Sequence, residues 1–340
     1  MAKKRINTYK FTPGIPQSGN LYPNAWAQIN ANKEWLKDES NAYIDFKITQ
    51  DTAANLYPNA TLRYLNNREY VKAEVAAWVA VQVAGNIAPF AGYTALHLSL
   101  MQSFRNQIAK ADIDAFWIGA SFPDVINAML NRTGFGPDCG IGNVQEPIAK
   151  IQMEVGRATK ASPSEIDVKL VAQHAFEYFV LNDVIPHELP PYMLKASLGD
   201  KDITNIAEKA LRQPFAFPYD LHFNRVTASS ALVALRALTS ATETAIHLPG
   251  IGRYVGGYPV RVSKAGIAFN LPDEWSMQQA ISVNEASLPW DGIESMTEDG
   301  TIFFTEETQQ ALFQCLGKPV EKLSAETAQE QASDLLRALG

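Results

Sequence analysis

A gapless internal repeat constrains the front of this chain more than any other feature of its sequence. Residues 20–48 align with residues 55–83 without an insertion, and both segments begin with NLYPNA. The correspondence continues past this hexapeptide, because NKEW at 32–35 aligns with NREY at 67–70. Charged, amide and aromatic residues recur together, which indicates a duplicated structural unit.

Each copy of the repeat has the pattern of a helix that follows a proline-containing turn. Apolar residues recur at seven-residue spacing, as Ile29, Leu36 and Tyr43 in the first copy and as Tyr64, Val71 and Trp78 in the second. One such unit cannot bury its apolar stripe alone, so we expect the two copies to pack together as a helical module. The repeat contains no His or Cys. It therefore predicts a surface for protein partners, including a second copy of the chain, rather than a catalytic site.

Charge divides the chain in the same way. Residues 1–110 hold 12 Lys/Arg and 7 Asp/Glu, a net charge of +5, whereas residues 111–340 hold 17 and 29, a net charge of −12. This asymmetry indicates two modules. No apolar run is long enough for a transmembrane helix, and no signal-peptide core follows the basic N-terminus. We expect neither a membrane nor a nucleic-acid partner, and two distant cysteines fit a reducing compartment.

The later part of the sequence mixes strand and helix patterns, so the chain as a whole is expected to have an α+β fold. Strands are predicted at 114–120, 168–174, 192–198, 258–263 and 266–271, with the last two forming a hairpin around Lys264-Ala265-Gly266. Helices are predicted at 123–130, 148–156, 203–211, 227–238, 276–288, 306–316 and 325–339, the last two with Thr305 and Ser324 as N-caps. The expected domains are a helical module at 1–94, a junction at 95–111, a mixed α/β domain at 112–317 and a C-terminal helix within 318–340.

Few residues in this acidic part have the pattern of a catalytic site. His174 ends the strand-like run VKLVAQH, a position suited to acid–base chemistry. The glycine-rich stretch at 134–143 follows a predicted helix, and the one at 250–259 leads into a predicted strand. Neither has the G-x-G-x-x-G context of a dinucleotide site, so both are interpreted as turns. In the first stretch, the turn would leave Asn143 pointing into a cleft. No metal-ligand spacing occurs, and we expect no metal and no bound cofactor.

Residues 1–94 also resemble a known class of protein. The start MAKKRINTYKFTPGI, the paired segments NAW…ANKEWLKDE…AYI and NAT…NNREYVKAEV…AWV, and the closing APFAGYT are similar to the N-terminal part of virion structural proteins of large tailed phages of the marine myovirus kind. The resemblance implies a structural role in a particle and no catalytic residues. It also implies a location in the virion or the host cytoplasm.

A second resemblance covers about residues 112–310. The runs ASFPDVIN, CGIGNV, VKLVAQH, NRVTASSALVALRAL, GGYPVRVSKAGIAFNLP and DGIESMTEDGTIFFT are similar to the later, substrate-binding part of nicotinamide-dependent dehydrogenases of the saccharopine/opine and malate/lactate-like groups. The resemblance implies that His174 carries a proton and that Asn143 orients the substrate. It also implies that Arg225 or Arg253 holds a substrate carboxylate. The N-terminal strand, glycine turn and helix of such enzymes are absent.

Three hypotheses follow from these patterns. The first is a phage-associated structural or assembly protein whose dehydrogenase-like second domain is non-catalytic. The second is an NAD(P)-dependent oxidoreductase that acts on a small oxo, hydroxy or amino acid. The third is a recombinant or artificial fusion, joined near 94–111, without an integrated function.

We predict that the isolated segment 1–94 forms a mostly helical module, because its two copies can bury their apolar stripes against each other. Circular dichroism of this fragment should show a helical spectrum. A spectrum dominated by strand would contradict the assignment.

Overall fold

The computed structural model describes residues 89–111, 115–181, 185–214 and 224–338, with the side chains of 224–225 excepted. The repeat at 20–48 and 55–83 lies outside the described residues. The chain divides into two compact units, of which one comprises Met1–Ile87, Ser99–Ala115 and Leu336–Gly340 and the other Ala88–Leu98 and Phe116–Leu335. The second unit, called the larger unit below, has a mixed α+β fold of helices and small sheets, as the sequence predicts.

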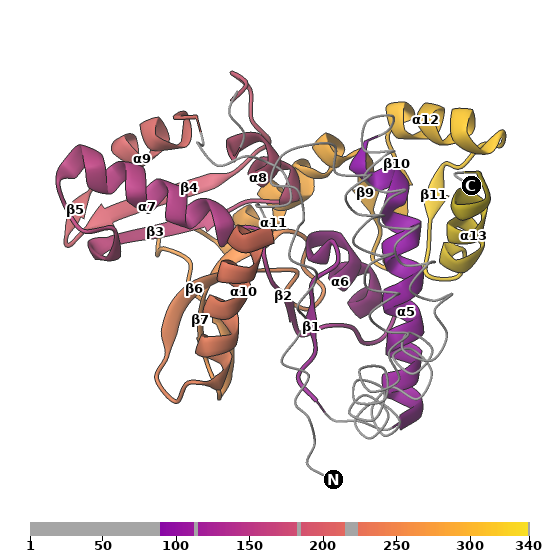
Figure 1. The fold of residues 1–340 in the computed structure, drawn as a ribbon, viewed down its shortest axis with the longest axis horizontal. Helices are drawn as coiled ribbons and strands as arrows, with labels where there is room; N and C mark the ends of the chain where they lie inside the picture. The colour runs from indigo at the N-terminus through magenta and orange to yellow at the C-terminus, as the bar shows by residue number, and fades with distance from the viewer. Residues whose placement is uncertain (1–88, 112–114, 182–184, 215–223, 339–340) are drawn as a thin grey trace, which may run out of the picture. The chain divides into compact units, whose positions relative to one another are not determined.

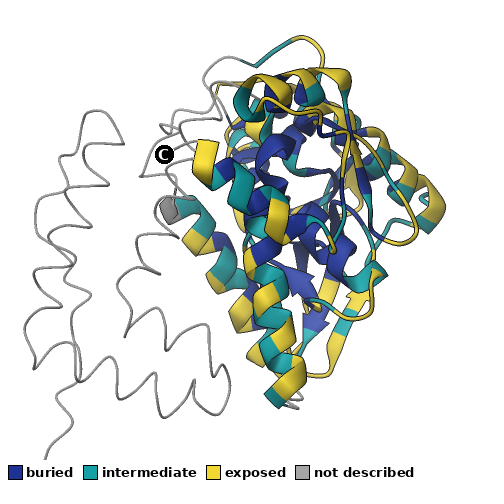
Figure 2. Ribbon diagram, turned by 90° about the vertical axis from the view of Figure 1, so that its right-hand side faces the viewer, coloured by how far each residue is buried: buried dark blue, intermediate teal, exposed yellow. Residues whose placement is uncertain are grey.

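One antiparallel sheet of the larger unit consists of β3 (Ile166–Val171), β4 (Met193–Leu198) and β5 (Lys201–Asp202). Alternate apolar residues of β3 point to one face of this sheet, as the period of a strand requires. Helices α7 (Glu146–Thr159) and α9 (Thr204–Leu211) pack on that face and enclose a buried apolar core with it. These elements lie together in Figure 1, and Figure 2 shows that buried positions gather on strands and on the inner faces of helices.

A second antiparallel sheet consists of β6 (Thr244–Pro249), β7 (Gly257–Ser263) and β8 (Gly266–Phe269), and α10 (Asn224–Thr239) packs against β6 and β7. The predicted hairpin is confirmed, because Ser263 pairs with Gly266 across the Lys264-Ala265 turn.

Two contacts join the first sheet to the second. Ala172, just past β3, pairs with Gly257 at the start of β7. The backbone N–H of Leu170 donates to Nε2 of buried His247 on β6, over 3.1 Å. His247 must be neutral to accept this hydrogen bond, and burial together with the charge of Lys169 lowers its pKa to about 3.

The remaining elements complete the fold. They are η1 (Phe90–Tyr93), α5 (Thr94–Ala111), β1 (Ile118–Gly119), α6 (Pro123–Arg132), β2 (Cys139–Gly140), η2 (Pro163–Glu165), α8 (His174–Val180), α11 (Met277–Ala286), η4 (Leu288–Asp291), β9 (Ile293–Met296), β10 (Ile302–Phe304), α12 (Glu306–Leu316), β11 (Lys322–Leu323) and α13 (Ala328–Ala338). Strand β1 pairs with β2 in parallel, and β9, β10 and β11 form a third antiparallel sheet.

Several predicted boundaries need correction. The expected junction at 95–111 is helix α5, which begins at Thr94 and crosses the division between the two units. Strand β3 ends at Val171, and His174 begins a helix because the side chain of Gln173 caps the N–H of Ala175. Strand β1 covers only two residues, and strands β6 and β9 were not predicted. Helix α12 was predicted with its Thr305 cap, which is confirmed.

His247 should make stability depend on pH in a defined direction. Its folded-state pKa of about 3 lies below the ordinary 6.5, so the unfolded chain binds more protons between these values. The stabilisation by neutral His247 is therefore complete above about pH 6.5 and is lost as the pH falls, by up to about 1.4 kcal/mol per pH unit.

We predict that His247→Gln, whose amide oxygen can still accept from Leu170, removes this component of the pH dependence. Urea unfolding of both proteins between about pH 7.5 and about pH 5 measures the difference. Stability curves that stay parallel over this range would contradict the assignment of His247.

Candidate active site

The candidate site centres on a histidine–carboxyl pair formed by two segments 117 residues apart. Nδ1 of His174, the first residue of α8, lies 3.0 Å from both Oδ1 and Oδ2 of Asp291, the last residue of η4. A carboxylate can only accept, so Nδ1–H donates and Nε2 carries the lone pair in the neutral ring. The side chains are 16% and 5% exposed, respectively. Nε2 has no hydrogen-bond partner among the described residues.

Gln173 fixes the orientation of Asp291. Its Oε1 accepts from the N–H of Ala175, and its Nε2 donates to Oδ2 of Asp291 over 2.6 Å. Gln173 is fully buried, so both ends of its amide are held. The side chain of Gln173 thus joins the start of α8 to the carboxyl group of Asp291. The relative orientation of His174 and Asp291, called the dyad below, is therefore fixed before any ligand binds.

Asp124 and Asn143 form a second pair beside the dyad. Nδ2 of Asn143 donates to Oδ2 of Asp124, which is completely buried in the first turn of α6. Burial raises the pKa of Asp124 to about 6, and the nearby Asp291 adds to the rise, against the opposing effects of His174 and Asn143. Oδ1 of Asp124 has no hydrogen-bond partner among the described residues.

Two bulky residues next to this pair have strained backbones. Phe122 has φ of 44° and Val144 has φ of 61°. The left-handed region is unfavourable for large or β-branched side chains, and such strain concentrates at functional sites. The conformation of Val144 directs its N–H to Oε2 of Glu177 over 3.1 Å.

Two buried carboxyl groups, those of Glu146 and Glu177, lie next to Val144. Glu146 begins α7 and Glu177 belongs to α8, and both are almost fully buried. Burial raises the pKa of Glu177 well above its ordinary value, and the adjacent charge and hydrogen bond of Glu146 raise it further. Burial and the neighbouring carboxyl group thus both favour the protonated form of Glu177.

These charges determine the state of His174. Burial lowers its pKa, but the charge and hydrogen bond of Asp291 and the charges of Asp124 and Glu146 outweigh burial, so the pKa rises. A second histidine, His97, lies close by and is neutral, because burial and then the charge of His174 lower its pKa to about 4. The site thus holds one imidazole that is readily protonated and one that is not.

The structure brings together two of the four residues predicted from sequence. Asn143 and His174 are joined through Asp124, which accepts from the first and whose charge raises the pKa of the second. The side chain of Arg253 is half exposed and forms an ion pair with Glu298 at 2.5 Å, so its predicted contact with a substrate carboxylate stays a prediction. The side chain of Arg225 lies outside the described residues, so its predicted contact with a carboxylate stays a prediction.

The glycine-rich stretch at 134–143 has a different context from the predicted one. Strand β2 intervenes, so Gly140 ends a strand and Gly142 follows it, and both precede helix α7. A Cβ on Gly140 would lie 2.3 Å from Cβ of Pro123, so this glycine serves close packing. A Cβ on Gly142 would face Oε1 of Glu146 at 3.4 Å. This carboxyl occupies the helix N-terminus that a pyrophosphate would need, so these residues do not fit a dinucleotide.

The second glycine-rich stretch, at 250–259, is a structural loop. Gly250 has φ of 54°, and a Cβ there would lie 2.1 Å from the carbonyl oxygen of Pro123. The N–H of Gly250 donates to the carbonyl of Gly256, whose own N–H donates to the carbonyl of Asp124. The loop thus closes on itself and supports α6, as its interpretation as a turn predicts.

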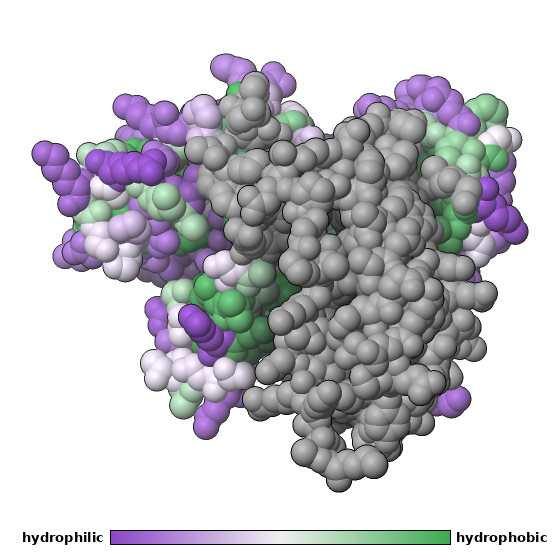
Figure 3. Space-filling view, in the orientation of Figure 1, coloured by the Kyte–Doolittle hydropathy of each residue, from purple (hydrophilic) through white to green (hydrophobic). Residues whose placement is uncertain are grey.

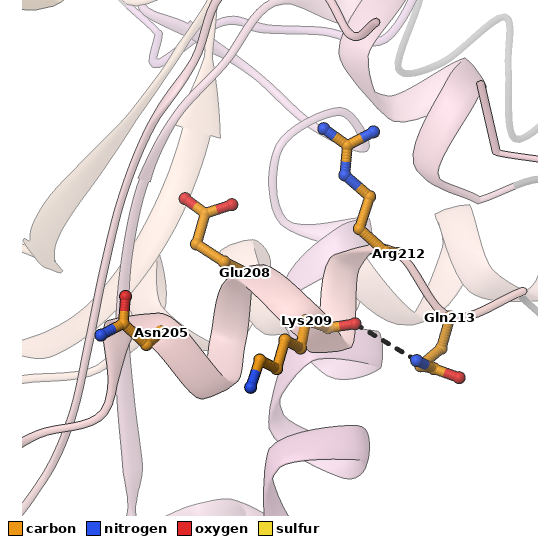
Figure 4. Close-up of a pocket in the computed structure, with 5 residues that line it drawn as sticks. All are labelled: Asn205, Glu208, Lys209, Arg212 and Gln213. Carbon is orange, nitrogen blue, oxygen red and sulfur yellow. Dashed lines mark hydrogen bonds between the residues drawn. The ribbon is translucent and has the colours of Figure 1, made fainter. Parts of the chain in front are cut away.

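Other surface features of the larger unit offer less chemistry. A polar hollow on α9 is lined by Asn205, Glu208, Lys209, Arg212 and Gln213 (Figure 4). Arg212 there already donates to the carbonyls of Pro186 and His187. Apolar side chains gather over α10 in Figure 3, where Leu232 and Leu235 are exposed. Within the described residues, no group of His, Cys, Asp and Glu could hold a metal ion, and no helix could cross a membrane.

Sequence reasoning missed most residues around His174, namely Asp124, Glu146, Gln173, Glu177 and Asp291. One signal was available, because Asp124 interrupts the apolar run around it directly after a predicted strand. Asp291 gave no such signal, since nothing local to its Pro-Trp-Asp-Gly turn indicates a partner 117 residues away.

Comparison of the chain with protein-family models, with curated proteins and with solved structures found no match. The resemblances to virion structural proteins and to dehydrogenases therefore stay predictions, and the chemistry must be argued from the site.

We predict that Asp291→Asn lowers the pKa of His174, because it removes the negative charge in contact with Nδ1. The histidine ring resonances, followed by NMR over a pH titration, report this pKa directly. Glu294→Gln, a change of the same kind at an exposed position of β9, serves as the control. An unchanged His174 pKa in Asp291→Asn would contradict the dyad.

Proposed function

We propose that residues 116–335 form a substrate domain in which His174 exchanges a proton with a small polar molecule. The main support for this proposal is that the two nitrogens of the His174 ring have different surroundings. Asp291 anchors Nδ1, whereas Nε2 has no hydrogen-bond partner among the described residues. An anchored ring with one free nitrogen is the arrangement that general acid–base catalysis uses.

The charges around His174 suit the donor role. A raised pKa keeps the imidazolium populated near neutral pH, so Nε2–H can protonate an oxygen that gains negative charge in the reaction. In the reverse direction the neutral ring takes the proton back. Asp291 stabilises the imidazolium throughout, and the amide of Asn143 donates to Asp124, whose charge also raises the pKa of His174. The substrate class that the dehydrogenase resemblance implies is a small oxo, hydroxy or amino acid.

The described residues supply the proton but not the electrons for an oxidoreduction. Glu146 occupies the helix N-terminus at the glycine turn, so no hydride step is assigned to this domain. The virion structural role is proposed for residues 1–94 and rests on the resemblance of this segment, with its repeat, to virion structural proteins of tailed phages. The proposed protein thus has a proton-transfer domain at residues 116–335 and a segment at residues 1–94 that serves packing and assembly.

We predict that the intact chain binds at least one of pyruvate, lactate and alanine at His174. These three share a carbon skeleton and differ in the oxo, hydroxy or amino group at the reacting carbon. Binding should shift the His174 ring resonance in NMR, and His174→Ala should abolish the heat of binding in calorimetry. His187→Ala, at an exposed histidine, should leave binding intact.

The same samples, mixed with NADH or NADPH, test the oxidoreductase hypothesis. Any turnover of the oxo acid should disappear in His174→Ala and persist in His187→Ala. The proposal fails if none of the three compounds shifts the His174 resonance, or if turnover survives the loss of His174.

A further inference from the structure

The segment 89–98 is built into the site although it precedes the predicted mixed domain. Ala91, Thr94 and Leu98 are completely buried. A Cβ on Gly292 would lie 2.5 Å from Cβ of Pro89, so η1 packs directly on the residue that follows Asp291. The start of this segment is thereby fixed against the turn that carries the dyad carboxyl.

Phe90 projects from this segment onto the imidazole of His174. The two ring centroids are 4.6 Å apart, and the Phe90 ring also lies 4.8 Å from Phe122, edge-on, and 5.8 Å from His97, stacked. Phe122 in turn lies 5.0 Å from His174. Phe122 is also the residue with the strained backbone, at φ of 44°. Two phenyl rings therefore border His174.

His97 supports Phe90 from behind. Its Nδ1 lies 2.6 Å from Oγ of Ser121, which fixes the ring on which Phe90 stacks. Its Nε2 is buried and has no hydrogen-bond partner among the described residues. Phe90 thus has a rigid backing on one side and the reactive imidazole on the other.

We propose that Phe90 is a specificity-determining residue that limits the space above His174 to small substrates. The inference rests on the proposed function, because it takes His174 as the group that faces the substrate. A phenyl ring in contact with the imidazole takes up room beside the ring, so we expect a short side chain on the reacting carbon to be accepted more readily than a ring. Shortening Phe90 opens the space, and enlarging it closes the approach to Nε2.

Access to His174 is measured without any substrate by its rate of modification with diethylpyrocarbonate. The free Nε2 attacks one carbonyl carbon, the ring becomes N-ethoxycarbonylated, and ethanol and carbon dioxide leave. Peptide mapping by mass spectrometry assigns the rate to His174 alone. We expect a several-fold faster rate in Phe90→Ala, an intermediate rate in Phe90→Leu and a slower rate in Phe90→Trp. Phe135→Ala, at an exposed ring packed on Trp117, should keep the original rate.

Specificity is measured by calorimetry with pyruvate and phenylpyruvate, which differ by one phenyl ring. The ratio of phenylpyruvate to pyruvate affinity should rise several-fold in Phe90→Ala and Phe90→Leu and should not change in Phe135→Ala. If Phe90→Ala fails to fold by circular dichroism, Phe90→Leu and Phe90→Trp decide the outcome. Equal modification rates in all folded variants, or an unchanged affinity ratio, would overturn the proposal. If pyruvate, lactate, alanine and phenylpyruvate all fail to bind every folded variant, the substrate role of His174 is wrong, and with it the specificity role of Phe90, while the modification rates still show whether Phe90 covers the ring.

Discussion

The hydrogen bond between His174 and Asp291 is the constraint on which the candidate site depends. It joins the start of α8 to the end of η4, and it defines which imidazole nitrogen is held and which is free. Hydrogen bonds to charged groups contribute about 1.5–3 kcal/mol, and more is lost when a buried partner is left alone. Gln173 adds a second bond to the same carboxyl. The geometry of the reactive nitrogen is therefore set by buried groups rather than by a surface loop.

The electrostatics of the site follow from burial without nearby cations. The carboxyl groups of Asp124, Glu146, Glu177 and Asp291 are all at least nine-tenths buried. Burying several negative charges close together is unfavourable. The pKa rises for Asp124 and Glu177, and His174 also retains its proton more strongly. The result is a low-dielectric site in which protons are held close to one exchangeable imidazole.

Local patterns predicted the elements whose cause is local. The β7–β8 hairpin follows from alternating apolar residues around a Lys-Ala turn, and α12 follows from its periodicity and the Thr305 cap. The dehydrogenase resemblance, rather than a local pattern, is what implied a common site for His174 and Asn143. The sequence did not predict that His174 begins a helix, because Gln173 is not a usual N-cap residue. Asp291 and Phe90 could not be found this way, since their roles come from contacts between segments far apart in the chain.

The central claim is that His174 is held by Asp291 through Nδ1 and presents Nε2 to a substrate. The most direct test is the pair of ¹⁵N chemical shifts of the His174 ring, measured by NMR above its pKa on the complete chain. The account predicts a protonated Nδ1, hydrogen-bonded to Asp291, and an unprotonated Nε2. A ring that carries its proton on Nε2 would contradict the account, because Nδ1 would then have no proton to donate to Asp291.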